Sequence, residues 1–267
     1  AEIINALADL AHQVLVKENP YAFNPDRLCR FAERNLGVTR SIVALFLKRF
    51  DPADPMSDAD FARACDAIRS TITSEVDLSE ATTSLNRFLD AVIATYRTNV
   101  HLQHRFGLSL RLDPGFLSSS EQAERPYGVF YVHGRGCNGF HVRFRDIARG
   151  GVRAIRPIGV DQHAREAERL YDEAYQLAFA QQLKNKDIPE GGAKAAILLE
   201  PEANVVRSVK AFIDSIIDLI TPDPDTQQHV VDFYGQQELL YFGPDENITP
   251  ELIEWIVDRA RRRGGPR

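Results

Sequence analysis

Cysteine is scarce in this 267-residue chain, and the few cysteines do not form a disulfide framework. Cys29, Cys65 and Cys137 are odd in number and far apart, whereas small disulfide-stabilised domains carry even sets of cysteines. Free thiols of this kind suit a reducing compartment. We therefore expect an intracellular, cytoplasmic protein.

Long apolar runs are missing too. No stretch approaches the roughly 18 apolar residues that a membrane span needs, so no membrane association is expected. The first residues, AEIINALADLAHQVL, lack the basic start and the cleavage pattern of a signal peptide. The chain starts at Ala1 and ends in RARRRGGPR beyond an expected helix, which predicts a piece of a longer protein.

Positive charge is not in excess, since 32 lysines and arginines and 38 aspartates and glutamates leave a formal net charge of −6. A field of this sign repels phosphates and argues against a general nucleic-acid binder. Any anion site must therefore be local. Nucleic-acid binding by the arginine-rich segment 143–156 is kept only as a minor alternative.

The first hundred residues have a helical pattern. Asn24, Ser57 and Ser79 stand where helix N-caps are expected, and Pro25 takes the first helical position after Asn24. Apolar residues at helical spacing follow Ser79. We therefore expect a helical N-terminal region over residues 1–100.

After residue 100 the pattern alternates between strands and helices. The runs GLSLRL, GVFYVH and GFHVRF have the period of two that is typical of strands. Further on we expect a long helix over 163–184, a buried strand in AKAAILLE, a helix capped by Asn204, a strand in ELLYF and a helix capped by Thr249. This pattern predicts an α/β domain over residues 101–267.

Two motifs could mark sites, but a turn explains both better. The run GRGCNG at 134–139 fits G-x-G-x-x-G, yet a strand-like run follows it, whereas a dinucleotide fingerprint opens a helix. We therefore expect a hairpin turn here. His133 and His141 could face each other across that hairpin with Cys137 nearby, but no fourth ligand or recognisable zinc spacing exists, so no metal is expected.

Three segments hold residues suited to chemistry. Arginines beside Gly150 and Gly151 suit a carboxylate or phosphate, although a solvated strand edge explains them equally well. Lys194 follows Gly-Gly-Ala and leads into an apolar strand, where a neutral amine could act as a base, or where a structural lysine could extend to solvent. Asp245, between an expected strand and helix, is either catalytic or a partner for backbone N–H groups.

Taken together, these segments resemble the substrate-binding domain of glutamate dehydrogenases, closest to the large NAD-specific class of fungi and protists. The resemblance is carried by PYGVFYVHGRGCNGFHVRFRDIARGG, QQLKNKDIPEGGAKAAILLEP and YFGPDENITPELIEWI, with FGLSLRLDPGFL upstream. It covers about residues 105–256. It implies an α/β fold in which a helical N-terminal region precedes the mixed-sheet substrate domain of amino-acid dehydrogenases, truncated before the Rossmann domain.

The resemblance also implies roles for single residues. Lys194 matches the catalytic lysine that assists attack of water on the imino intermediate, and Asp245 matches the aspartate that shuttles the amino-group proton. Lys184 matches the lysine that holds the substrate α-carboxylate, and Arg149 takes the position of a lysine that reaches the distal carboxylate. Close backbone access to the substrate is expected at Gly150, Gly151, Gly191 and Gly192.

The implied reaction is the NAD-dependent oxidative deamination of L-glutamate to 2-oxoglutarate and ammonia, a step of amino-acid catabolism. Arg149 favours glutamate over amino acids without a distal carboxylate. Because no nucleotide-binding fold follows the last expected helix, we expect NAD to be bound by a missing domain and the isolated chain to be inactive. A homo-oligomer is expected from the family. The alternative is a non-catalytic regulatory or assembly module with the same fold.

Overall fold

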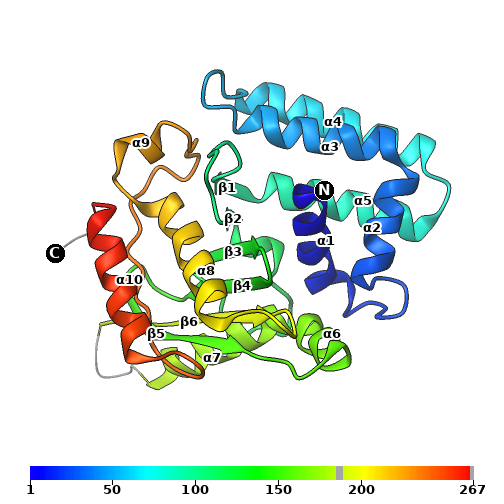
Figure 1. The fold of residues 1–267 in the computed structure, drawn as a ribbon. Helices are drawn as coiled ribbons and strands as arrows, with labels where there is room; N and C mark the ends of the chain where they lie inside the picture. Colours follow the sequence, from blue (N-terminus) through cyan, green and yellow to red (C-terminus); the bar gives the residue numbers. More distant parts are fainter. Residues whose placement is uncertain (185–188, 265–267) are drawn as a thin grey trace. The chain divides into compact units, whose positions relative to one another are not determined.

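The computed structural model describes residues 1–184 and 189–264. The chain divides into two compact units, Ala1–Thr95 and Tyr96–Arg267. Helices make up the first unit, and the second is a mixed sheet with helices against it (Figure 1). The prediction of N-terminal helices followed by a mixed α/β part is thus confirmed. None of the described helices is long and apolar enough to cross a membrane.

The helices of the first unit are amphipathic and bury their apolar faces against one another. They are α1 (Glu2–Leu15), α2 (Pro25–Arg34), α3 (Leu36–Arg49), α4 (Asp58–Glu75) and α5 (Ser79–Ile93). Their shared core includes Leu10, Leu28, Phe46, Leu85 and Phe88, which are all fully buried. Burial of such side chains is the main stabilising contribution to a helical unit of this kind.

Local capping explains where two of these helices begin. Asn24 and Ser57 each accept a hydrogen bond from the backbone N–H three residues further on, at 3.0 and 3.2 Å. Both predicted caps are confirmed. The cap predicted at Ser79 is wrong, because Ser79 is the first residue of α5 and Leu78 holds the cap position without a side-chain bond.

The second unit is built on one sheet. Its described strands are β1 (Thr95–Thr98), β2 (Gly107–Leu112), β3 (Gly128–Gly134), β4 (Cys137–Arg143), β5 (Ala148–Ile155), β6 (Gly191–Leu199) and β7 (Gly243–Pro244). They pair in the order β1-β2-β3-β4-β6-β5-β7. The neighbours from β2 to β6 are antiparallel, whereas β5 runs parallel to both β6 and β7.

Helices cover both faces of the sheet around β6. The described helices of this unit are α6 (Val160–Glu168), α7 (Leu170–Lys184), α8 (Val205–Ile220), α9 (Pro224–Gln227) and α10 (Pro250–Arg262), with a short 3-10 turn at Pro114–Phe116. Ile197 joins α8 and α10 in the buried core, while Phe140 meets Tyr171 of α7 at a ring distance of 5.4 Å. Since side chains alternate along a strand, Gly192 and Lys194 face α7.

Three expected elements differ from the structure. The helix expected over 163–184 is two helices that meet at Arg169, where the backbone leaves the helical region with φ −122° and ψ 12°. The ELLYF run forms no strand, because the side chain of Glu238 points inward and pairs with a cluster of buried arginines. The two residues after the run form β7 instead. The arginine-rich segment contains β5, which is flanked by two strands and is not an edge.

Other expectations are confirmed. The four runs GLSLRL, GVFYVH, GFHVRF and AKAAILLE all lie in strands. Asn204 and Thr249 accept hydrogen bonds from the backbone N–H groups at the starts of α8 and α10. The glycine run at 134–139 is the turn between β3 and β4, where Gly136 has a φ of 79°. A left-handed φ of this size favours glycine.

Candidate active site

The sheet brings Lys194 and Asp245 into direct contact, although 51 positions separate them in the chain. In β5, Gly151 pairs with Lys194 of β6 on one side and with Gly243 of β7 on the other. Asp245 follows β7 directly. Nζ of Lys194 donates a hydrogen bond to Oδ2 of Asp245, and only 11% and 30% of the two side chains are exposed.

Asp245 is held in its ionised form. Burial alone would raise the pKa of Asp245, but the hydrogen bond and charge of Lys194, with the charge of Arg153, outweigh burial and keep this pKa below its usual range. The amine of Lys194 lies directly against this carboxylate.

Gly151 makes room for this pair. A Cβ at Gly151 would lie 3.1 Å from Cβ of Asp245 and 3.5 Å from Nζ of Lys194. The contact between Lys194 and Asp245 therefore lies directly against the backbone of Gly151, and a side chain at Gly151 would crowd Asp245.

The other three candidate glycines border backbone and side chains at close range. A Cβ at Gly150 would fall 1.6 Å from the carbonyl oxygen of Ala193, and a Cβ at Gly192 would fall 2.1 Å from a carbonyl oxygen of α7. At Gly191 the neighbour is the side chain of Arg145, at 2.6 Å. These glycines let β5, β6 and α7 pack closely, so the structure gives them a packing role.

Arg153 belongs to this site, although the sequence did not single it out. It stands two residues after Gly151 on the same face of β5. Its Nη1 donates to Glu173 of α7 at 3.0 Å, and its Nε lies 3.5 Å from Oδ2 of Asp245 and 3.4 Å from Glu246. Arg149, Gly151 and Arg153 occupy every second position of a strand, and this spacing could have indicated that they lie on one face.

Arg149 and Lys184 lie at the end of the site where β5 and β6 begin. Arg149 pairs with Gly192 in the sheet register, and its Nε is 3.2 Å from the Glu190 carboxylate. Its side chain is 51% exposed, so it is open to a ligand. Lys184 is the exposed last residue of α7, two positions beyond Gln182, whose side-chain oxygen accepts from Gly192 N–H at 2.8 Å. Residues 185–188, within the motif that carries both lysines, lie outside the described residues.

A comparison with known families fits this geometry. Residues 67–231, more than half of the chain, match the family described as bacterial NAD-glutamate dehydrogenase, catalytic domain. The chain belongs to this glutamate dehydrogenase family. The resemblance to the large NAD-specific class is thereby confirmed, and Arg149, Lys184 and Lys194 all fall inside the matched range.

Large glutamate dehydrogenases are also the relatives found for the chain. Glutamate dehydrogenase 2 of Dictyostelium discoideum is 41% identical over 202 residues, which cover 74% of this chain and 18% of the relative. The NAD-specific glutamate dehydrogenase of Neurospora crassa is 39% identical over 260 residues, or 91% of this chain and 24% of the relative. The Saccharomyces cerevisiae enzyme of the same name is 39% identical over 188 residues, or 68% and 17%. The chain therefore spans about a fifth of the length of these relatives.

The potential ligands near the hairpin of this family member do not converge. His133 pairs with Asn138 in the register and His141 pairs with Phe130, so the two histidines do not face each other as the sequence suggested. Burial lowers the pKa of His141 to about 3 and raises that of Cys137 to about 12, which leaves both neutral. Within the described residues no group of three or more acidic, histidine or cysteine side chains could hold a metal ion.

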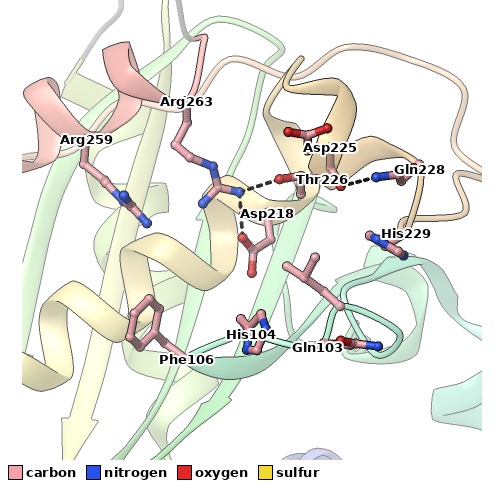
Figure 2. A pocket seen from close by; sticks show the side chains of 11 residues that line it. Gln103, His104, Phe106, Asp218, Asp225, Thr226, Gln228, His229, Arg259 and Arg263 are labelled. Carbon is pink, nitrogen blue, oxygen red and sulfur yellow. Dashed lines mark hydrogen bonds and ion pairs between the residues drawn. The ribbon is translucent and has the colours of Figure 1, made fainter.

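A pocket of about 450 Å³ lies away from Lys194 in the same unit, between α8, α9, α10 and the loop after β1 (Figure 2). Its lining shares no residue with the Lys194 site. Arg263 donates to Asp218 at 2.9 Å, and Arg259 donates to Asp214 at 2.5 Å. Both arginines of the lining therefore already have a carboxylate partner.

Proposed function

We propose that this chain is the substrate-binding part of an NAD-dependent glutamate dehydrogenase, with the mixed-sheet substrate domain of amino-acid dehydrogenases over residues 101–267. The contact of Lys194 with Asp245 beside Gly151 carries this proposal. A lysine and a carboxylate in contact can divide the proton transfers of oxidative deamination between them. The family match supports the choice of reaction.

In this proposal two cationic side chains bind the carboxylates of the substrate, and Lys194 and Asp245 transfer protons. Lys184 holds the α-carboxylate and Arg149 the distal carboxylate, since ammonium and guanidinium groups suit these two anions. Asp245 takes a proton from the substrate amino group, and NAD would accept the hydride that leaves when the amine becomes an imine. Lys194, in its neutral form after giving its proton to solvent water, takes a proton from the water that attacks the imino carbon.

NAD would be bound by another part of the protein. The glycine run at 134–139 closes a hairpin and leads into β4, whereas a dinucleotide fingerprint must open a helix whose N-terminus receives the pyrophosphate. These residues therefore do not fit the cofactor, and the steps assigned to this chain are substrate binding and proton transfer. The cytoplasmic location, the homo-oligomer and the inactivity of the isolated chain stay predictions.

Calorimetric titration of the chain with 2-oxoglutarate and with glutamate tests substrate binding. We expect Arg149→Glu to weaken binding at least about tenfold, because it reverses the charge that faces the distal carboxylate. Glu190→Gln is the matched control with the opposite expected sign. It removes the carboxylate that lies 3.2 Å from Arg149 and competes for it, so affinity should rise about two- to fivefold.

The two variants also separate the alternatives. Equal affinity in the Arg149→Glu variant and the unchanged chain would show that Arg149 does not contact the ligand. A chain that binds neither compound, with all variants folded, would favour the non-catalytic regulatory or assembly module.

A further inference from the structure

The side chain of Arg153 connects three acidic groups around the proposed site. Its guanidinium donates to Glu173 of α7 at 3.0 Å and lies 3.5 Å from Asp245 and 3.4 Å from Glu246. The side chain is only 26% exposed. The hydrogen bond to Glu173 holds the guanidinium in place, and Nε attracts Asp245 and Glu246 as ion-pair partners without a hydrogen bond of its own.

Arg153 and Lys194 lie against the same atom of the proposed proton shuttle. Lys194 donates to Oδ2 of Asp245, and Nε of Arg153 is 3.5 Å from that oxygen. The carboxylate therefore has two cationic neighbours, one on β5 and one on β6. Lys194 is therefore not the sole counter-ion of the Asp245 carboxylate.

The backbone around Asp245 is held to β5 without the Arg153 side chain. The N–H of Ala154 donates to the carbonyl oxygen of Glu246 at 3.0 Å, and the side-chain amide of Asn247 donates to the carbonyl oxygen of Ala154 at 2.7 Å. β5 and β7 also pair directly. Loss of the guanidinium should therefore leave the loop in place and change the carboxylate alone.

We propose that Arg153 is a positioning residue that, fixed by Glu173, orients the Asp245 carboxylate beside Lys194. The positioning itself is a property of this chain, and its effect on catalysis rests on the proposed function. The charge of Arg153 also contributes to the lowered pKa of Asp245, after the larger contributions of burial, which raises it, and of Lys194, which lowers it. Removing Arg153 should thus raise the pKa of Asp245.

A carboxyl titration of the chain tests the positioning without any need for activity. In the chain labelled with ¹³C at aspartate carboxyl groups, the signal missing from an Asp245→Asn sample identifies Asp245. Arg153→Gln should move its titration to higher pH, and Arg153→Lys should move it back toward the unchanged chain. Arg156→Gln is the matched control, since Arg156 is exposed just beyond β5 and should leave the titration unchanged.

Kinetics of a glutamate dehydrogenase that contains this chain test the catalytic consequence. We expect Arg153→Gln to lower kcat by roughly 10²-fold with a smaller change in KM, because a misplaced proton shuttle acts mainly on the chemical step. The acid limb of the kcat profile should move to higher pH, as a carboxyl group with a raised pKa requires. Arg153→Lys should restore part of both.

Each outcome decides a separate point. An unchanged Asp245 titration in Arg153→Gln overturns the positioning role. The same role is overturned if Arg153→Gln and Arg153→Lys lose the same thermal stability and the same kcat, with no change in the pH profile of either. A shifted titration in a chain that neither binds glutamate nor supports turnover would leave the positioning intact and overturn the proposed function. Wild-type kcat in Arg153→Gln beside an inactive Lys194→Ala enzyme would overturn the catalytic consequence alone.

Discussion

Replacing Lys194 by alanine in a glutamate dehydrogenase that contains this chain is expected to lower kcat by about 10²–10⁴-fold. The amine is nearly buried, contacts Asp245 and lies against Gly151. Its removal takes away the proposed base and leaves Asp245 without its closest cation. Because Arg149 and Lys184 would still hold the two carboxylates, KM should change much less than kcat.

Steady-state kinetics with glutamate provide the measurement. Lys210→Ala is a suitable control, since Lys210 lies over the Trp255 ring at 4.7 Å, on the α8 side of the sheet, and should not affect turnover. Partial recovery of the Lys194→Ala enzyme by small primary amines would support the role of a base. Turnover equal to the wild type would show that Lys194 is not that base.

The second large effect is expected from Glu238, whose replacement by glutamine should destabilise the fold by about 3–5 kcal/mol. The Glu238 carboxylate is 1% exposed and is the shared partner of three buried arginines. Nη1 of Arg97 lies at 3.3 Å, Nε of Arg111 at 2.9 Å and Nη2 of Arg143 at 2.5 Å from its oxygens. Glutamine fills the same volume but removes the carboxylate that these three cations share.

Urea or thermal unfolding of the chain measures this loss. Asp146→Asn is the matched control, because Asp146 lies 3.3 Å from the same Arg143 but is 65% exposed. An exposed pair contributes at most about 1 kcal/mol, so this variant should unfold close to the unchanged chain. If Glu238→Gln loses no more stability than Asp146→Asn, the buried cluster does not stabilise the fold.

Glu238 also links stability to the proposed site. It lies in the segment that returns across the sheet and leads, through β7, to Asp245. The sequence read ELLYF as a strand because its apolar residues suit one. In the structure its first residue instead buries a carboxylate among arginines that lie on β1, β2 and β4. A partner set spread over three strands leaves no local pattern by which it could be predicted.

Predictions that depended on neighbours within a few residues succeeded more often. The caps at Asn24, Ser57, Asn204 and Thr249 are confirmed because a cap bonds to a backbone N–H only three positions away. The hairpin at 134–139 is confirmed for the same reason. The cap predicted at Ser79 was wrong by one position. The single helix predicted over 163–184 was wrong because the apolar pattern continues through Arg169, where the backbone leaves the helical conformation.

The sequence by itself determined the family, the helical first unit and the strand-forming runs, because these depend on composition, short motifs and local periodicity. Only the tertiary structure placed β5 between β6 and β7 and so brought Lys194 and Asp245 together at Gly151. It also assigned Arg153 its acidic partners, one of them on α7. The physical reason is that strand order and ion pairing between distant residues follow from the packing of the whole sheet, which no short stretch of sequence encodes.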